Sequence, residues 1–211
     1  MSHLPNARQA EEAYARQILE DLGKEIYVLP DDVRFSGQGD ALPCGDYVFA
    51  GTGYRTDPAA HTAISEILGY KVIPLQTIPA RDNNGTPIIN QASGWPDSDF
   101  YDIDLAIAIL RWPTLEQKGL VAWCPDAFEP ASQATMRSLD FVDLLEVPLQ
   151  EAVGVSACNL VSSGYHVIMN AGAPTLQAAI EKAGLSVTTL SNKELAKNGG
   201  SVRCCSVTLD N

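Results

Sequence analysis

The sequence predicts an α/β fold made of repeated units, each with the order strand, strand, helix, strand, and about four such units fit along the 211 residues. Two observations carry this prediction. One block recurs along the chain: an amphipathic helix, a glycine or polar turn, and a short β-branched strand that ends in leucine. After each block, a polar segment opens a new strand. A unit of this kind cannot bury its apolar face alone, so the units are expected to pack around a common pseudo-symmetry axis.

The first block lies at the start of the chain. A helix over about residues 8–22 is indicated by apolar side chains at intervals of four, namely Ala10, Tyr14, Ile18 and Leu22. Gly23 is expected to end this helix, because glycine readily adopts the left-handed conformation found just after a helix. A strand at residues 26–29 follows. The two strands that should precede the helix are absent from the sequence, so the first unit is predicted to be incomplete.

Three further blocks follow. Their predicted helices cover residues 58–68, about 128–138, and a stretch that begins near Pro174. Their predicted closing strands lie at residues 70–75, 141–149 and 185–190. The strand that leads into each helix is predicted at residues 45–50, 120–124 and 165–169. The middle block is the least regular of the three, because Asp143 stands where the others carry the turn glycine.

Length and composition limit the classes of function. With 45% hydrophobic residues, residues 1–211 are expected to form a single, N-terminally incomplete domain. No apolar run approaches the roughly 20 residues of a membrane span, and the N-terminus lacks the layout of a signal peptide, so we expect a cytoplasmic protein without membrane contact. The net charge of -12 argues against binding nucleic-acid phosphates and favours a small, cationic substrate.

The five cysteines are odd in number and contain no C-x-x-C pair. This spacing does not suggest a disulfide framework or a zinc site. We therefore expect reduced thiols, and we expect neither a metal nor a cofactor. The cysteines are Cys44, Cys124, Cys158, Cys204 and Cys205.

Polar residues at the starts of strands are the candidate functional residues. The pseudo-symmetry is expected to bring Asp40, Asp102, Asp104 and Cys204 into one pocket. Asp102 and Asp104 are separated by one residue, so on a strand both carboxylates lie on the same face. Cys204 follows a glycine pair on what is predicted to be a terminal strand, and Cys205 should then face the core.

Four segments, in chain order, resemble successive motifs of the guanidine-modifying pentein superfamily, and most closely those of dimethylarginine dimethylaminohydrolases and related amidinotransferases. They are residues 35–42, 51–57, 100–104 and 199–205. The resemblance covers nearly the whole chain. It implies a five-bladed α/β propeller of ββαβ units, in agreement with the unit derived from the repeats, and it implies that the first blade is missing here.

The resemblance also implies a chemistry. Cys204 matches the nucleophile, whose thiolate attacks the central carbon of a guanidinium, expels an amine or ammonia, and leaves a covalent thiouronium that water or another amine resolves. Asp104 matches the substrate-binding aspartate, and with Asp102 it can clasp a guanidinium. Arg55 matches the arginine that receives the substrate's α-carboxylate. Asp40 is expected to shape the glycine-rich turn or to contact the substrate.

Two positions depart from the family pattern. Ser36 stands at the usual glutamate, and Asp102 stands at the usual histidine, which in the family protonates the leaving amine and later activates water. Removing a general acid or base typically costs about 10²–10⁴ in rate. The chain has three histidines, none of which is expected to replace the missing one: His3, His61 and His166.

Three functions therefore remain open. The chain is a C–N hydrolase of arginine-like substrates of the dimethylargininase type, or an amidinotransferase, or a catalytically degenerate member that binds an arginine-like ligand or a partner. The absent first blade further predicts a homo-oligomer or a complex with a separate N-terminal blade. An open propeller would otherwise expose a sheet edge and apolar core.

Overall fold

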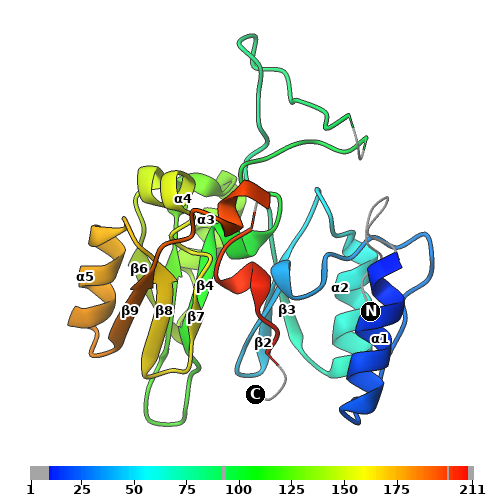
Figure 1. Cartoon of the computed structure of the whole chain (residues 1–211), viewed down its shortest axis with the longest axis horizontal. Coiled ribbons are helices and arrows are strands. Elements are labelled where there is room, and N and C mark those ends of the chain that lie inside the picture. The colour runs from blue at the N-terminus through cyan, green and yellow to red at the C-terminus, as the bar shows by residue number, and fades with distance from the viewer. Residues whose placement is uncertain (1–9, 92–93, 199, 209–211) are drawn as a thin grey trace.

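Three sheets of three strands form the body of the protein, and each sheet is one complete ββαβ unit. The computed structural model describes residues 10–91, 94–198 and 200–208. In each unit the first two strands are antiparallel and the second and third are parallel, with the helix crossing between them. The predicted unit is therefore present three times in full (Figure 1).

The three units contain the same elements in the same order: two strands, a helix and a third strand. The first contains β1 (Ala41–Cys44), β2 (Tyr47–Gly51), α2 (Pro58–Leu68) and β3 (Lys71–Leu75). The second contains β4 (Ile107–Arg111), β5 (Gly119–Trp123), α3 (Pro130–Arg137) and β6 (Val142–Glu146). The third contains β7 (Val161–Ser162), β8 (His166–Asn170), α5 (Pro174–Lys182) and β9 (Ser186–Leu190).

Local sequence signals explain where these helices begin and end. Proline occupies the first turn of α2, α3 and α5, where its missing N–H would have no helical partner in any case. Gly69 ends α2 with a φ of 76°, a left-handed conformation that glycine adopts at little cost. The helix predicted at residues 58–68 forms with these bounds.

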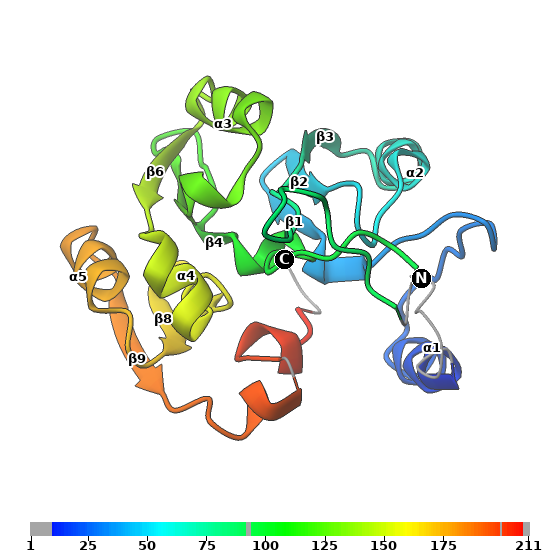
Figure 2. The same ribbon diagram turned by 90° about the horizontal axis from the view of Figure 1, so that it is seen from above.

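The core is shared by all three units. Strand β1 packs beside β4, and β4 beside β7, so the first strands of the units lie next to one another. Strand β5 is buried at every residue, as expected for a central strand covered on both faces. Seen from above, the units follow one another around a common centre, with α2, α3 and α5 on the outside (Figure 2). This arrangement is consistent with a propeller.

The first block folds differently from its prediction. Helix α1 (Glu11–Asp21) forms, but it buries no residue, and the apolar side chains of Tyr14 and Ile18 are 75% and 60% exposed. Residues 26–29 do not form a strand, so that prediction is wrong. A strand needs a neighbour to satisfy its backbone groups, and the described chain offers none at this point.

Two further differences lie between the units. The strand predicted at residues 141–149 ends earlier, because Leu149 begins an additional helix, α4 (Leu149–Val155). Within α4, the buried carboxylate of Glu151 accepts the backbone N–H groups of Thr175 and Leu176, at 2.9 and 3.1 Å, and so caps the start of α5. In the described part of the chain, no helix has both the length and the apolar character to cross a membrane.

Candidate functional site

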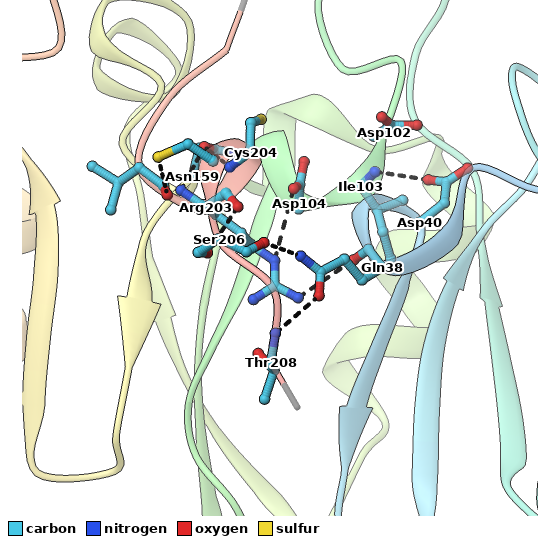
Figure 3. Close-up of polar contacts among 12 residues, drawn as sticks. Gln38, Asp40, Asp102, Ile103, Asp104, Asn159, Arg203, Cys204, Ser206 and Thr208 are labelled. Atoms are coloured by element: carbon cyan, nitrogen blue, oxygen red, sulfur yellow. Dashed lines mark hydrogen bonds and ion pairs between the residues drawn. The ribbon is translucent and has the colours of Figure 1, made fainter. Parts of the chain in front are cut away.

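Asp40, Asp102, Asp104 and Cys204 lie together at one end of the shared core, although they come from distant parts of the sequence (Figure 3). Asp40 directly precedes β1, and Asp104 lies three residues before β4. The starts of the first strands of adjacent units thus meet, as the repeat pattern predicted. We call Asp40, Asp102 and Asp104 the carboxylate cluster.

The two aspartates of the 100–104 motif are not on a strand, contrary to the prediction. Residues Ile103–Leu105 form a turn of 3₁₀-helix that begins after Asp102. The amide of Ala106 donates to the carbonyl of Ile103 at 2.9 Å, which closes the turn. The backbone amide of Ile103 is also bonded to Asp40 at 2.8 Å, so it is unavailable to a neighbouring strand. Asp104 is consequently buried at 3% exposure, whereas Asp102 is turned toward Arg55.

Asp40 and Asp102 each lie against a glycine that leaves room for the carboxylate. A Cβ atom at Gly51 would lie 2.0 Å from Oδ1 of Asp40, and one at Gly39 would lie 3.0 Å from Oδ2 of Asp102. The glycines of the motifs therefore make room for two carboxylates rather than merely forming turns. Burial and the charge of Asp102 raise the pKa of Asp40 to about 7.

Asp104 faces an arginine that the sequence analysis did not single out. Nε of Arg203 lies 3.7 Å from Oδ2 of Asp104, and both side chains are largely buried, with exposures of 15% and 5%. Burial and the charge of Asp102 raise the pKa of Asp104 to about 8, and the Arg203 guanidinium opposes that rise. The cluster therefore holds protons at neutral pH, because three carboxylates so close together cannot all ionise freely.

Arg55 lies at the more exposed edge of the cluster. Its Nη1 is 3.3 Å from Oδ2 of Asp102, and its guanidinium stacks over the ring of Tyr101 at 3.9 Å. Its side chain remains 36% exposed. The structure thus brings Arg55 beside the carboxylates. Its assignment as the receptor of a substrate carboxylate stays a prediction.

Cys204 lies in a turn of 3₁₀-helix, Arg203–Cys205, and not on a strand as predicted. The amides of Arg203 and Cys204 both donate to Oδ1 of Asn159, at 3.1 and 3.3 Å, instead of to a neighbouring strand. Cys204 is exposed, and partial desolvation together with the charge of Asp104 raises its thiol pKa. The prediction that Cys205 faces the core is wrong, since its side chain is also exposed.

Gln38 fastens the segment after Cys204 to the first unit. Its side-chain amide donates to the carbonyl of Ser206, and its Oε1 accepts the amide of Thr208 at 3.3 Å. These bonds, and the one from Arg203 to the Gln38 carbonyl at 3.3 Å, replace the strand pairing that the sequence suggested. The segment that carries Cys204 and the turn that carries Asp40 are therefore held together by hydrogen bonds.

Of the two positions that depart from the family pattern, Asp102 belongs to the carboxylate cluster and its charge acts on Asp40 and Asp104, whereas Ser36 brings no charge. Ser36 donates its backbone amide to Thr56 at 3.2 Å. His61 is bonded to the carbonyl of Gly51 at 2.8 Å, and His166 lies on the exposed face of β8 against Ser186. His3 lies outside the described residues. In the described part of the chain, no group of three or more His, Cys, Asp or Glu side chains is arranged to hold a metal ion.

Asn159 is a second residue that the sequence analysis missed. It is fully buried two residues before β7, the place that Asp40 and Asp104 occupy in the other units. Among the described residues, its Nδ2 has no hydrogen-bond partner. The repeat register was the available signal, because a polar segment was predicted to open a new strand after each block.

The raised pKa of Asp40 gives a testable pH dependence of stability. The folded protein keeps the proton of the Asp40 carboxyl up to about pH 7, whereas an unfolded aspartate loses its proton near pH 3.8. The stabilisation of the folded state that comes from this difference is fully present below pH 4 and is lost as the pH rises between the two values. Asp40→Asn removes the charge and keeps an oxygen for the Ile103 amide. It should raise the free energy of unfolding at pH 8 by roughly 1–3 kcal/mol, and by much less at pH 4.

Urea unfolding at both pH values measures this difference, with Asp143→Asn on the exposed face of β6 as the matched control. An equal effect of Asp40→Asn at pH 4 and pH 8 would contradict the buried, protonated state of Asp40.

Comparison with known proteins agrees with this geometry. No family model matches the chain. The chain is 34% identical over 171 residues to N(G),N(G)-dimethylarginine dimethylaminohydrolase of Mycobacterium tuberculosis, covering 81% of this chain and 48% of the relative. It is 28% identical to the bifunctional arginine dihydrolase/ornithine cyclodeaminase ArgZ of Synechocystis, covering 93% of this chain and 25% of the relative. The chain thus spans half or less of the length of these relatives.

Solved structures show the same relationship. The N-terminal domain of ArgZ bound to product, described as an arginine dihydrolase, superimposes with a TM-score of 0.77 and 28% identity, over 97% of this chain and 67% of that one. A dimethylarginine dimethylaminohydrolase adduct shares the fold at a TM-score of 0.62 and 20% identity. The resemblance seen in the motifs is therefore confirmed: the homologues of the chain are dimethylarginine dimethylaminohydrolase and the ArgZ-type arginine dihydrolases, which supports its place in the guanidine-modifying pentein superfamily.

Proposed function

We propose that the chain binds an arginine-like guanidinium compound at the carboxylate cluster and acts as a C–N hydrolase of the dimethylargininase type. The observation that carries this proposal is an exposed thiol, Cys204, beside the buried carboxylates Asp104 and Asp40. Three carboxylates and two guanidinium groups leave one uncompensated negative charge when all are ionised. One substrate cation would neutralise it. The relatives named for dimethylarginine and arginine hydrolysis support this class of substrate.

In the proposed reaction, Sγ of Cys204 forms a bond to the central guanidinium carbon. The bond from that carbon to the leaving nitrogen breaks after the nitrogen gains a proton, and dimethylamine, methylamine or ammonia departs. Water then adds to the thiouronium carbon, the C–S bond breaks, and a ureido product leaves with the thiol restored. The raised thiol pKa means that the bound cation itself must help to form the thiolate.

The proton source is the part of the mechanism that differs most from the family pattern. Asp102 stands at the usual histidine, but it has Asp40 and Asp104 as neighbours, whose pKa values are raised to about 7 and about 8. We propose that the cluster as a whole supplies and takes up the proton. A group that titrates near neutral pH suits general acid and base work better than an isolated aspartate with a pKa of about 4.

Binding without turnover is the second candidate function. It is favoured by the ion pair between Arg55 and Asp102. Asp102 is the residue at the family's histidine position, and here its carboxylate is engaged in a structural contact rather than in proton transfer. An amidinotransferase remains a third candidate, because it differs only in whether an amine or water resolves the thiouronium. We also propose a cytoplasmic location, supported by five free thiols, which a reducing compartment maintains.

Selective alkylation tests the nucleophile. Chloroacetamidine carries the cationic amidine that mimics a guanidinium, whereas chloroacetamide has the same reactive carbon without the charge. We expect the cationic reagent to label Cys204 at least tenfold faster than the neutral one, as the cluster concentrates a cation beside the thiol. Cys205 is also exposed; it should show no such preference and serves as the internal control.

Peptide mapping by mass spectrometry reads both sites in one sample. Asp104→Asn should reduce the preference at Cys204 without changing the rate at Cys205. Equal preference at the two cysteines, or an unlabelled Cys204 in the folded protein, would overturn the nucleophile assignment.

We further propose that the chain associates through its first block, most simply with a second copy of itself. Tyr14 and Ile18 of α1 and Leu22 just after it are exposed to solvent. A separate apolar groove is lined by Tyr27 and, from α2, Ile67. Exposed apolar surface of this kind is typical of an interface. A separate chain that carries the missing strands is the alternative occupant.

Sedimentation at micromolar concentration measures this association. A dimer is expected, and Ile18→Glu on α1 should dissociate it, whereas Gln17→Glu on the same helix should not. A compact monomer that remains stable at all concentrations would contradict the proposal.

A further inference from the structure

Arg203 is held more firmly than its neighbour Cys204. Its side chain is 15% exposed, its Nε lies 3.7 Å from Oδ2 of Asp104, and its Nη2 donates to the carbonyl of Gln38 at 3.3 Å. Its backbone amide is bonded to Asn159 at 3.1 Å. Burial of a guanidinium is costly unless it is paired, and here the carboxylate of Asp104 provides the pairing.

Arg203 and Cys204 leave the same turn in opposite directions. Figure 3 shows the thiol of Cys204 on the side of the carboxylate cluster where Asp102 lies, and the guanidinium of Arg203 below Asp104, next to Gln38. On this lower side, Arg203 and Gln38 also line a cavity of about 180 Å³ between the first strands of the units. The guanidinium of Arg203 therefore lies on the side of Asp104 that is opposite to the Cys204 thiol.

We propose that Arg203 is a positioning residue for Asp104: it stabilises the ionised form of this carboxylate and aims it at a guanidinium ligand on the thiol side. This inference rests on the proposed function, because it assigns Arg203 to the same site. Arg203 does not itself contact the ligand. It acts through Asp104, and its bond to Gln38 couples the turn that carries Cys204 to the turn that carries Asp40.

The electrostatic surroundings of Asp104 explain why an arginine is needed. Other titratable groups of the described chain lie near Asp104, and the carboxylates of Asp102 and Asp40 among them disfavour its ionised form. These groups are Asp40, Asp102, Tyr101, Cys158 and Cys204. Arg203 is the counter-charge in this environment. Its planar fork also reaches Asp104 and Gln38 at once, which a lysine ammonium does less well.

The test compares Arg203→Gln and Arg203→Lys with the unaltered protein in two measurements. The first follows the titration of Asp104 by NMR of ¹³C-labelled aspartate carboxyl groups in ligand-free protein, with Asp104→Asn to assign the signal. We expect Arg203→Gln to raise the titration midpoint by about 1–3 units, and Arg203→Lys to restore most of the original value. Arg137→Gln, which removes an exposed ion pair with Glu146, is the matched control and should leave the midpoint unchanged.

The second measurement is the affinity for L-arginine by calorimetry, in a Cys204→Ala background that prevents turnover. At pH 7, Arg203→Gln should weaken binding about tenfold for each unit by which the Asp104 midpoint rises, and raising the pH to 9 should recover part of the loss. A positional role predicts this pH rescue, whereas general loosening of the fold does not.

The two measurements separate the two hypotheses. An unchanged Asp104 midpoint in a folded Arg203→Gln protein would overturn the role of Arg203, whatever the ligand affinity. If Arg203→Gln does not fold, the Arg203→Lys protein decides: a midpoint within error of the original supports the role of the charge, and a midpoint raised as far as the 1–3 units above contradicts it. A failure of the unaltered site to bind L-arginine would refute the proposed function, while the ligand-free titration would still decide the role of Arg203.

Discussion

The hydrogen bond from the Ile103 amide to Asp40 links the first unit to the second and sets the geometry of the site. It holds the start of β1 against the turn that precedes β4, and it places the carboxylate of Asp40 near those of Asp102 and Asp104. Gly51 and Gly39 allow this approach, since a side chain at either position would collide with a carboxylate. One hydrogen bond from a backbone amide of the second unit to a side-chain carboxylate of the first thus helps to gather the negative charge on which the proposed chemistry depends.

Charge compensation explains much of the remaining arrangement. Arg55 pairs with Asp102 at the exposed edge, and Arg203 pairs with Asp104 on the buried side. Two cations against three carboxylates leave a site that favours protons or a cationic ligand. The family nucleophile position, Cys204, lies beside this cluster in a turn fixed by Asn159. Loss of the family histidine therefore leaves the site with groups that can still carry protons at neutral pH.

Most of the fold was predictable because its signals are local. The prolines and Gly69 around α2 mark the ends of that helix, and the apolar run of β5 marks a covered central strand. The strand at residues 26–29 was not predictable from the same signals. Its β-branched pattern matches the other units, but a strand also requires a neighbouring strand, and local sequence does not report whether one is present.

The sequence indicated which residues meet at the candidate site, but it did not indicate the local backbone conformation that brings them together. The repeat register correctly indicated that Asp40, Asp102, Asp104 and Cys204 meet. The alternation of Asp102 and Asp104 suggested a strand, but the amide of Ile103 is taken by Asp40, and the chain turns there instead. Arg203 and Asn159 were missed because their roles arise from contacts across the units, 99 and 44 or 45 residues apart in sequence.

We expect a guanidinium ligand to displace one of the protons that the three crowded carboxylates share, and the other to stay for the chemical step. Calorimetric titration of the Cys204→Ala protein with L-arginine, in buffers of different ionisation enthalpy, counts the released protons directly. Proton release on binding is expected near pH 7, with an affinity that rises between about pH 6 and pH 8.5 and then levels off as the ligand-free cluster ionises. Binding that exchanges no protons and has the same affinity across this range would contradict this expectation.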